Sequence, residues 1–404
     1  MNSSIGDRIR SLRELRGGMT QEQLAERADI SIDTVRRLEQ TQAGAHMSTY
    51  EKLASALDVT LGHLLGQPTM THNLPDSGGL IALRNAIQDA STLPGLGNYR
   101  ATEQEAPSIP DVKAALSTAQ KRYQTGQFTE LVTGLPGLVS DLNAAVREAE
   151  NSRGHDEVWS MSAATHIIVA DVAAQLGHTD LAFMAVERSL IAAQRASDPL
   201  REALAVSTLS LVLLRQGRWE QAQAVAARKA AEIEPRFSDK DPDRIAMYGI
   251  LLLSSAVSAS RAERADDATE MVRQAKAAAA LSGAVRVRGT AFGPASVGMQ
   301  ATTVEVSLKR FPEALEAASD VRSEDLPWKI SRARHLLDVA HAEYQTGSDD
   351  TAREILLGID EEHPEWMDHQ VLAASTAEGL LEKARRRDKD LRRLAARLRV
   401  GSGL

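Results

Sequence analysis

Residues 20–40 of the chain read TQEQLAERADISIDTVRRLEQ, and this stretch decides the fold of the N-terminal part. Thr20 followed by Gln23 has the form of a capping box, in which the threonine oxygen accepts a hydrogen bond from the third helical N–H and the glutamine side chain reaches back. A helix is therefore expected to begin at Gln21. Ser31 is a good N-cap for a second helix. The stretch predicts two short helices separated by a tight bend.

The apolar residues of this stretch recur with helical spacing, which indicates the buried side of each helix. The inward-facing residues are Leu24, Ala25, Ala28, Val35 and Leu38. Ala25 is small enough to let the second helix cross close to the backbone of the first. Asp29 stands in the bend, and aspartate can adopt the left-handed conformation. The polar residues of the second helix are left pointing outward.

This arrangement resembles the helix-turn-helix of the phage-repressor-like family, often called the XRE or Cro/C1 type. The resemblance covers residues 4–66, from the arginine-studded segment IGDRIRSLRELRGGM to the segment STYEKLASALDVTLGHLLG, which looks like the two closing helices of the family. In this fold the second helix of the pair enters the major groove of DNA, while the first helix crosses the backbone. The resemblance implies a five-helix DNA-binding domain over residues 1–66.

The resemblance also implies which residues contact DNA. Gln21 would contact a phosphate at a helix N-terminus. The residues that would face the groove are Ser31, Ile32, Asp33, Thr34, Arg36 and Arg37. Arg13 and Glu39 match an internal ion pair that ties the first helix to the reading helix in related repressors. The alternative is a capped helical hairpin whose charged outer side is only solvated.

The charge of this domain limits how it can bind DNA. Residues 1–66 carry eight Lys and Arg against nine Asp and Glu. Because phosphate affinity comes from neutralised charges, non-specific binding should be weak. The arginines that would have to form a local patch are Arg8, Arg10, Arg13, Arg16, Arg36 and Arg37.

Length and composition describe the rest of the chain. Its 404 residues leave ample material for a large second domain, and its 3% aromatic content favours close-packed helices over a sandwich or barrel. The absence of cysteine excludes disulfides and thiolate metal sites and fits a reducing cytoplasm. No apolar signal core and no run of membrane-spanning length occurs, so we expect a cytoplasmic protein without membrane contact. A net charge of −8 argues against general polyanion binding.

Residues 67–110 are predicted to be a linker that contains one helix. The segment GQPTMTHNLPDSGG is rich in Pro, Gly, Thr and Asn. A helix is expected at about residues 80–90, with Leu80, Leu83 and Ile87 on one face. This face would pack either on the large domain or on a partner chain.

Residues 111–404 are helical by periodicity, and turn-and-restart segments recur along them. The segments are YQTGQFTEL, QLGHTDLA, RQGRWEQA, SRAERADDA, LKRFPEA and YQTGSDDTA, which end at Leu131, Ala182, Ala222, Ala268, Ala314 and Ala352. The intervals of 38 to 51 residues exceed the period of about 34 of the tetratricopeptide repeats that they resemble. We predict an all-α protein in which the DNA-binding domain precedes an α-solenoid of degenerate repeats. An irregular all-α bundle is the alternative.

Two segments interrupt or end the repeats. LSGAVRVRGTAFGPASVGMQ at residues 281–300 carries four glycines and a proline, which predicts a longer loop. The C-terminal half resembles actinobacterial regulators that join this DNA-binding module to a tetratricopeptide-like domain, which leaves either a ligand role or a connector role for the loop. Residues 382–399 have nine Lys and Arg against three Asp and Glu, with Leu391, Leu394 and Leu398 on one side. They predict a helix that caps the solenoid or, alternatively, contacts DNA or a second subunit.

Catalytic signatures are missing from the sequence. No GxxxxGK phosphate loop, HExxH or GxSxG motif occurs. His335, Asp338 and His341 are spread over more than one face of a helix, which disfavours a metal site built from them. We therefore expect no enzymatic activity, no catalytic residues, no metal and no cofactor.

The two predicted parts together favour a sequence-specific transcriptional regulator. One small module makes few base contacts against many competing genomic sites, so a homodimer on a pseudo-palindromic operator of double-stranded DNA is expected. Half-sites would lie about 34 Å apart, or a multiple of that distance. The alternative is a tetratricopeptide protein-interaction scaffold in which DNA binding is secondary.

The solenoid groove is the expected site for an effector, either a small molecule or a short peptide. The candidate groove residues, chosen from the first helix of successive pairs, are His166, Tyr248, Phe292, Gln300, Arg334 and Asp338. Regulators of this construction that bind peptides use groove asparagines, and this chain has none after Asn151. Gln175, Gln300 and Gln345 could partly substitute for them.

Overall fold

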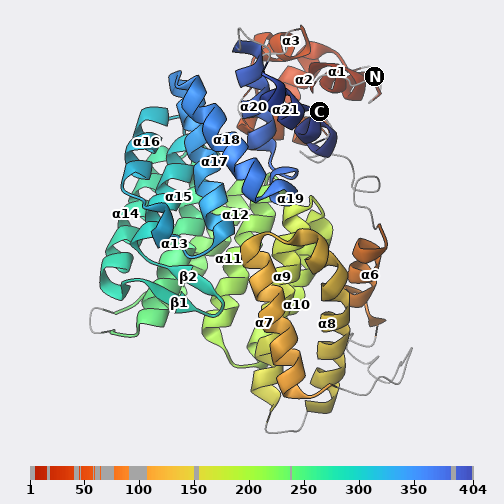
Figure 1. The fold of residues 1–404 in the computed structure, drawn as a ribbon, viewed down its shortest axis with the longest axis vertical. Helices are drawn as coiled ribbons and strands as arrows, with labels where there is room; N and C mark the ends of the chain where they lie inside the picture. The colour runs from red at the N-terminus through yellow and green to blue at the C-terminus, as the bar shows by residue number, and fades with distance from the viewer. Residues whose placement is uncertain are drawn as a thin grey trace.

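A computed structural model describes the fold of most of the chain. The described residues are 5–15, 19–40, 45, 47–57, 59, 64, 77–90, 107–149, 154–236, 239–383 and 388–402. The fold is helical, with a small N-terminal domain beside a large array of paired helices (Figure 1).

The N-terminal domain begins with the predicted helix pair. Its described helices are α1 (Ile5–Leu15), α2 (Gln21–Arg27), α3 (Ile32–Gln40) and α4 (Met47–Ala56). Thr20 and Gln23 form the predicted capping box, and Ser31 Oγ accepts a hydrogen bond from the Thr34 N–H at 3.2 Å. Asp29 has a φ of 50°, which is the left-handed conformation expected for the bend. The predicted fifth helix lies outside the described residues, apart from Leu64.

The core of this domain contains the residues that periodicity placed inside. These residues, each no more than 4% exposed, are Leu24, Ala25, Ala28, Val35 and Leu38. Ile9 of α1 and Leu53 of α4 belong to the same cluster. The pair of helices α2 and α3 is therefore held by apolar contacts with α1 and with α4.

The predicted linker lies mostly outside the described residues, but its helix does not. That helix is α6 (Ser77–Ile87), and it packs along α8 (Phe128–Ala149). Leu80, Leu83 and Ile87 are buried in the core of the large domain. Of the two packing alternatives, the structure shows the one within the chain.

The large domain is an α-solenoid of helix pairs, with an inner and an outer layer. The inner helices are α7 (Ile109–Thr125), α9 (His155–Gln175), α11 (Pro199–Arg215), α13 (Pro242–Arg261), α15 (Pro294–Ser307) and α17 (Lys329–Thr346). Their outer partners are α8, α10 (Thr179–Arg195), α12 (Trp219–Ile233), α14 (Ala265–Ser282), α16 (Phe311–Ser319) and α18 (Asp349–Glu362). Each inner helix contacts the next inner helix, and α17 also contacts α7. The inner layer therefore closes into a ring.

The predicted turn-and-restart segments all join an inner helix to its outer partner. The residues that align these segments are 0–1% exposed: Leu131, Ala182, Ala222, Ala268, Ala314 and Ala352. Alanine at five of these positions lets the two helices of a pair approach closely, since its side chain fills almost no space. The repeat interpretation is confirmed.

The expected loop over residues 281–300 is only partly correct. Strands β1 (Val285–Val287) and β2 (Thr290–Phe292) pair antiparallel with Val285 opposite Phe292, and α15 begins directly afterwards at Pro294. The two residues between the strands, Arg288 and Gly289, have φ of 52° and 89°. A two-residue turn with both φ positive matches the twist of paired strands, so a hairpin replaces the open loop.

The C-terminal basic segment caps the solenoid. After α19 (Pro364–Met367) and α20 (Val371–Lys383), α21 (Lys389–Ser402) covers the end of the last pair. The predicted apolar side is buried through Leu391, Leu394 and Leu398. Arg397 pairs with Asp360 and, at 2.8 Å, with Asp368. None of the helices in the described part of the chain is long and apolar enough to cross a membrane.

Candidate nucleic-acid interface and central cavity

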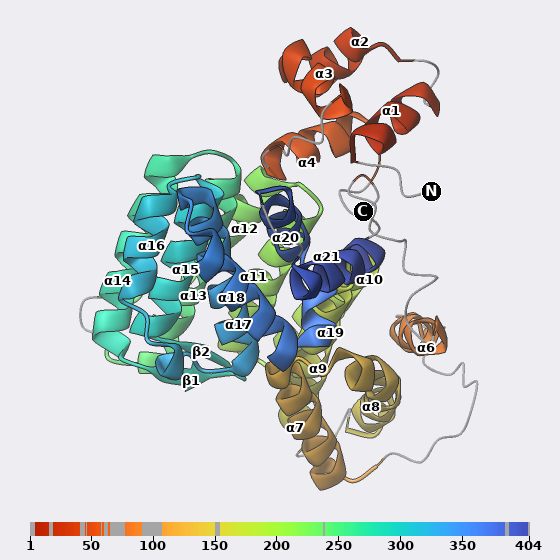
Figure 2. The ribbon, with the colours of Figure 1, turned by 45° about the horizontal axis from the view of Figure 1, so that its top comes forward.

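Helix α3 lies in the N-terminal domain, at one end of the molecule (Figures 1 and 2). Ser31, Asp33, Arg36 and Arg37 are exposed, and the Asp33 side chain is 89% accessible. Thr34 is half-buried. Ile32, also half-buried, packs against the domain core. Of the predicted groove residues, the four exposed ones form the outer surface of α3.

Arg36 is held over the junction of α2 and α3. Its guanidinium lies 3.3 Å from a carboxylate oxygen of Glu22 and 3.9 Å from one of Asp33. All three side chains are substantially exposed, so these contacts orient the arginine but contribute little to stability. A phosphate or base edge can replace them at small cost.

Glu39 is the buried anchor of α3. Arg13 donates to both of its oxygens at 2.8 and 3.0 Å, and Gln21 donates to one of them at 2.7 Å. Burial acts to raise the pKa of Glu39, but the hydrogen bonds from Arg13 and Gln21 outweigh it and hold the pKa below its usual range. The predicted ion pair between α1 and α3 is confirmed.

The other predicted contributors to DNA binding are placed differently. Gln21, expected at a phosphate, is hydrogen-bonded to Glu39 inside the domain. Arg8 donates to the Leu64 carbonyl at 3.2 Å, and Arg13 is engaged with Glu39. Arg16 lies outside the described residues. Arg8 and Arg13 of α1 therefore stabilise the N-terminal domain at least as much as they contribute to an outer patch.

Helix α4 connects the N-terminal domain to the solenoid (Figure 2). Val371, at the start of α20, packs against the core of the N-terminal domain. Glu51 of α4 is 8% exposed and lies beside Arg215 and Arg261, the last residues of α11 and α13. The N-terminal domain is therefore docked on the solenoid through α4 and its core.

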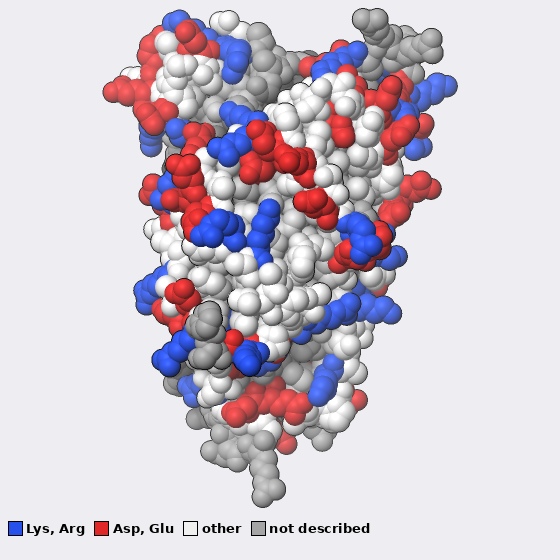
Figure 3. Space-filling view, turned by 90° about the vertical axis from the view of Figure 1, so that its left-hand side faces the viewer, with Lys and Arg blue, Asp and Glu red and all other residues white. Residues whose placement is uncertain are grey.

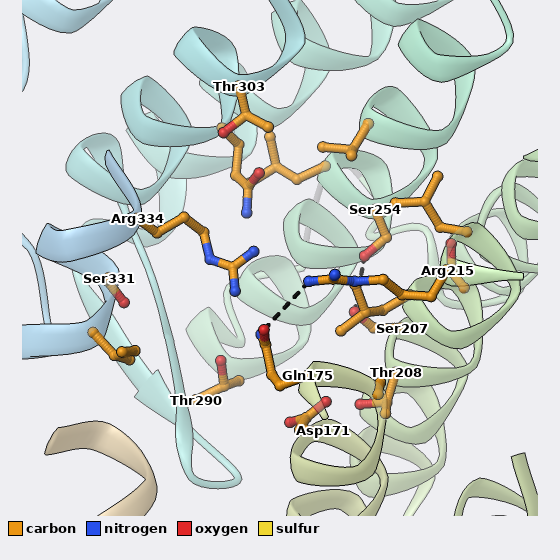
Figure 4. Close-up of a pocket in the computed structure, with 18 of the residues that line it drawn as sticks. Asp171, Gln175, Ser207, Thr208, Arg215, Ser254, Thr290, Thr303, Ser331 and Arg334 are labelled. Carbon is orange, nitrogen blue, oxygen red and sulfur yellow. Dashed lines mark hydrogen bonds between the residues drawn. The ribbon is translucent and has the colours of Figure 1, made fainter. Parts of the chain in front are cut away.

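A cavity of about 950 Å³ lies within the ring of inner helices (Figure 4). All of the inner helices contribute to its wall. The hairpin contributes Arg288 to Phe292 near the starts of α11 and α15, while Glu51 and Ala54 of α4 line it near the ends of α11 and α13. The cavity thus extends between the hairpin and the N-terminal domain.

Four of the six predicted effector residues line this cavity. They are Phe292, Gln300, Arg334 and Asp338. The other two lie outside its wall: His166 Nδ1 is 2.8 Å from the Ser162 carbonyl oxygen within its own helix, and the Tyr248 hydroxyl is 3.5 Å from Gln274. Gln175, considered as a substitute for asparagine, also lines the cavity, whereas Gln345 does not.

Sequence reasoning missed the arginines at the helix ends. Arg215 and Arg261 both line the cavity. Each stands seven residues before the buried alanine of its repeat, Ala222 or Ala268, and Gln175 holds the same place before Ala182. The register of the repeats therefore contained a signal for these residues.

The side chains of Arg215 and Arg334 point toward one another across the cavity, with Gln175 below them (Figure 4). Arg215 donates to Gln175 Oε1 at 3.3 Å. Burial and the nearby charges of Arg334 and Arg261 lower the pKa of Arg215 to about 10. This is a close group of like charges in a shielded space.

The carboxyl groups of the cavity have raised pKa values. Burial raises the pKa of Asp171 to about 7, although Arg334 and the Tyr123 hydroxyl favour its charged form. Burial likewise raises the pKa of Glu51 to about 7 against the opposing influence of Arg261, Trp219 and Arg215. Asp338 accepts a hydrogen bond from Thr303 at 2.6 Å, and burial raises its pKa as well. Among the described residues, no group of three His, Asp or Glu is placed to hold a metal ion.

Comparison with known proteins identifies the N-terminal domain. Residues 4–65 match a family model described as a helix-turn-helix domain. This match supports the interpretation that the chain is a DNA-binding transcription regulator. No curated protein matches the chain. Among solved structures, it is similar to Bacillus thuringiensis PlcR in a crystal structure with the peptide PapR7 and DNA. The identity is 13%, the match covers 78% of this chain and 92% of that chain, and the TM-score is 0.36.

Proposed function

We propose that this protein is a sequence-specific, non-enzymatic transcription regulator whose helix α3 reads operator DNA. The observation that carries the proposal is the exposed polar side of α3 in a helix-turn-helix domain. Ser31, Asp33, Arg36 and Arg37 are accessible there, while Val35, Leu38 and Glu39 hold the helix from behind. Side chains on a rigid helix can donate to and accept from base edges in the major groove.

The regulator is proposed to act as a homodimer. The N-terminal domain carries no excess of positive charge, so its non-specific phosphate affinity is weak and one domain makes few contacts. Two domains on a pseudo-palindrome double the interface and fit half-sites about 34 Å apart, or a multiple of that distance.

The solenoid is proposed to sense an effector in its central cavity. A cavity of about 950 Å³ with polar and apolar walls lies at the upper end of the range of about 300–1,000 Å³ for ligand pockets. An effector changes DNA binding only if it binds one arrangement of the molecule better than another. Glu51 connects the cavity wall to the DNA-binding domain, so the two sites share a structural element.

Mapping of bound genomic sites tests the DNA-binding proposal. The wild type is expected to occupy a small set of sites with a common pseudo-palindromic motif, and the variant Arg36→Ala/Arg37→Ala to lose them. The matched control Arg228→Ala/Arg273→Ala removes two exposed arginines from α12 and α14 and should leave the map unchanged. If the α3 variant occupies the wild-type sites, α3 does not read DNA, and a protein-interaction scaffold becomes the better account.

On the isolated operator, the same α3 variant should bind more weakly by about 2 kcal/mol or more, because each arginine contact to a base contributes about 1–3 kcal/mol. Fluorescence anisotropy with a labelled operator duplex measures this loss. A change below the experimental error in affinity would show that neither arginine contacts the DNA.

A further inference from the structure

Three arginines that line the cavity form no salt bridge with any other residue that the structure describes. Among the described residues, Arg334 and Arg261 form no hydrogen bond, and neither has a carboxylate oxygen within 4.0 Å. Arg215 donates only to the uncharged amide of Gln175. All three side chains line the same cavity.

Two of the carboxyl groups that line the cavity attract Arg334 from a distance, but their closest partners are hydroxyl groups. Asp171 interacts with the Tyr123 hydroxyl, and Asp338 accepts from Thr303 at 2.6 Å. Burial raises the pKa of both carboxyl groups. The arginines are therefore left with more positive charge than their surroundings balance.

A cluster of arginines without salt-bridge partners lowers the stability of the protein when no ligand is bound. Removing a cation from water without a partner costs several kcal/mol, and like charges repel one another more strongly in a shielded site. The chain as a whole carries a net charge of −8, and on the face with α14 and α16 both signs are interspersed (Figure 3). The concentration of positive charge in the cavity is thus a local property of this site.

We propose that the cavity binds a small organic oxyanion, a carboxylate or a phosphate, whose oxygens lie between Arg215 and Arg334. Planar guanidinium groups pair with carboxylate and phosphate oxygens through two parallel hydrogen bonds. The hydroxyls of Ser207, Ser254 and Thr290 and the apolar side chains of Leu253 and Met299 line the same cavity, so the ligand has an organic body as well as an acid group. This inference rests on the proposed function, because it names the chemical class of the effector.

Glu51 makes this site sensitive to the DNA-binding domain. Its carboxyl group is the acid that the chain itself places beside Arg215 and Arg261, and its Oε2 atom is buried without a hydrogen-bond partner among the described residues. A bound oxyanion beside Arg215 repels a charged Glu51 and competes for the same guanidinium. Binding of the anion therefore weakens the docking of α4. By linkage, if DNA holds the N-terminal domain in another position, DNA binding changes the affinity for the anion by the same factor as the anion changes the affinity for DNA.

The site is tested by thermal unfolding of the full-length protein in citrate, in pyrophosphate and in sodium chloride of equal ionic strength. Both probe anions also stabilise proteins by exclusion from the surface, so the difference between variants decides the result. The melting temperature of the wild type and of the control Arg273→Gln should rise more in a probe anion than in chloride. Arg334→Gln and, independently, Arg215→Met should lose this extra rise.

Each outcome of this test has one meaning. A specific rise with pyrophosphate alone indicates a phosphate ligand, with citrate alone a carboxylate ligand, and with both a site for either group. No rise beyond chloride, or equal rises in the wild type and Arg334→Gln, overturns the proposal. In the absence of a probe anion, Arg334→Gln should unfold at an unchanged or higher temperature, since it removes one of several like charges from the cavity; a large decrease would show a structural arginine instead.

This experiment is independent of DNA. Loss of operator binding in the wild type with intact anion binding would refute the regulator but keep the site. Operator binding without any specific anion effect would keep the regulator and refute the site. The stabilising probe anion should also change operator affinity in the wild type and not in Arg334→Gln.

Discussion

Glu39 shows at the scale of single residues how the reading helix is held. Its side chain is inaccessible to solvent, and that of Arg13 is 11% exposed. Removing one partner of a buried pair leaves the other charge unbalanced, which costs about 3–5 kcal/mol. The position of α3 therefore depends on a contact made by α1 as well as on its own apolar side.

The variant Arg13→Ala should destabilise the N-terminal domain by about 3 kcal/mol, because Glu39 loses the arginine that donates to both of its oxygens and keeps only the more distant Arg10 at 3.9 Å. Deuterium exchange of the α3 amides in the full-length chain measures the loss. Because the folded pKa of Glu39 is lowered, its contribution is complete above the usual pKa of glutamate and is lost as the pH falls through the lowered value. Unchanged protection of α3 in Arg13→Ala would contradict this role.

Glu51 has the opposite behaviour, since burial raises its pKa from 4.5 to about 7. The docked form then binds more protons than the undocked form between these pH values, so docking is strongest at low pH and weakens as the pH rises to about 7. Trp219 lies beside Glu51, so we expect its fluorescence to respond to the ionisation of this carboxyl group. The fluorescence of the wild type should change with a midpoint near pH 7.

The controls for this titration are Glu51→Gln and Trp219→Phe, each of which should abolish the transition near neutral pH. Asp171, whose pKa is also raised to about 7, remains in both variants. A transition that persists in Glu51→Gln would assign the signal to another group and remove Glu51 from the account.

The cavity arginines show how far residue-level prediction could reach. Arg334, Asp338 and Gln300 followed from placing them on first helices of repeats, whereas Phe292, chosen in the same way, lies in strand β2. Arg215 could have been predicted in the same way, because it has the same position in its repeat as Gln175 has in another. Glu51 could not be found this way, because its environment depends on how two domains meet in space.

The hairpin shows at the scale of elements where glycine and proline mislead. They predicted an open loop, but β-branched and aromatic residues on both sides of a two-residue turn form strands instead. The hairpin packs on α13, where Phe292 lies directly over Gly249. This contact requires a residue without a side chain at position 249.

The variant Gly249→Ala should therefore lower stability, since the added Cβ would lie 2.1 Å from Phe292 Cζ and force the hairpin away from α13. Overpacking of this kind costs about 1–3 kcal/mol. Gly358→Ala in α18 is the control: nothing lies within 4 Å of its added Cβ, and it should stabilise the helix by about 0.5–1 kcal/mol. If both variants shifted the melting temperature in the same direction, the hairpin would accommodate the added methyl group without a loss of stability.

The whole molecule combines a docked DNA-binding domain with a closed ring of helices. The repeats were visible in the sequence because their turns and buried alanines recur. Closure of the ring between α17 and α7 was not, since it depends on the sum of small rotations between pairs. Closure converts an open groove into a cavity lined by all of the inner helices.

The proposed dimer is a property of the whole molecule. Sedimentation equilibrium of the full-length protein at tens of micromolar should give twice the mass of 43.6 kDa. Specific interfaces bury about 1,200–2,000 Å² and are normally formed within this concentration range. A monomer throughout it would refute dimerisation before DNA binding.

The central claim, that α3 enters the major groove, is tested most directly by DNA cleavage from a tethered iron chelate. The chain contains no cysteine, so Asp33→Cys on the exposed side of α3 gives one attachment point, and Ser117→Cys on α7, far from the N-terminal domain, gives the matched control. The account predicts strong cuts centred on each half-site of the operator from position 33 and none from position 117. Equal or absent cleavage from the two positions, with operator binding intact, would contradict it.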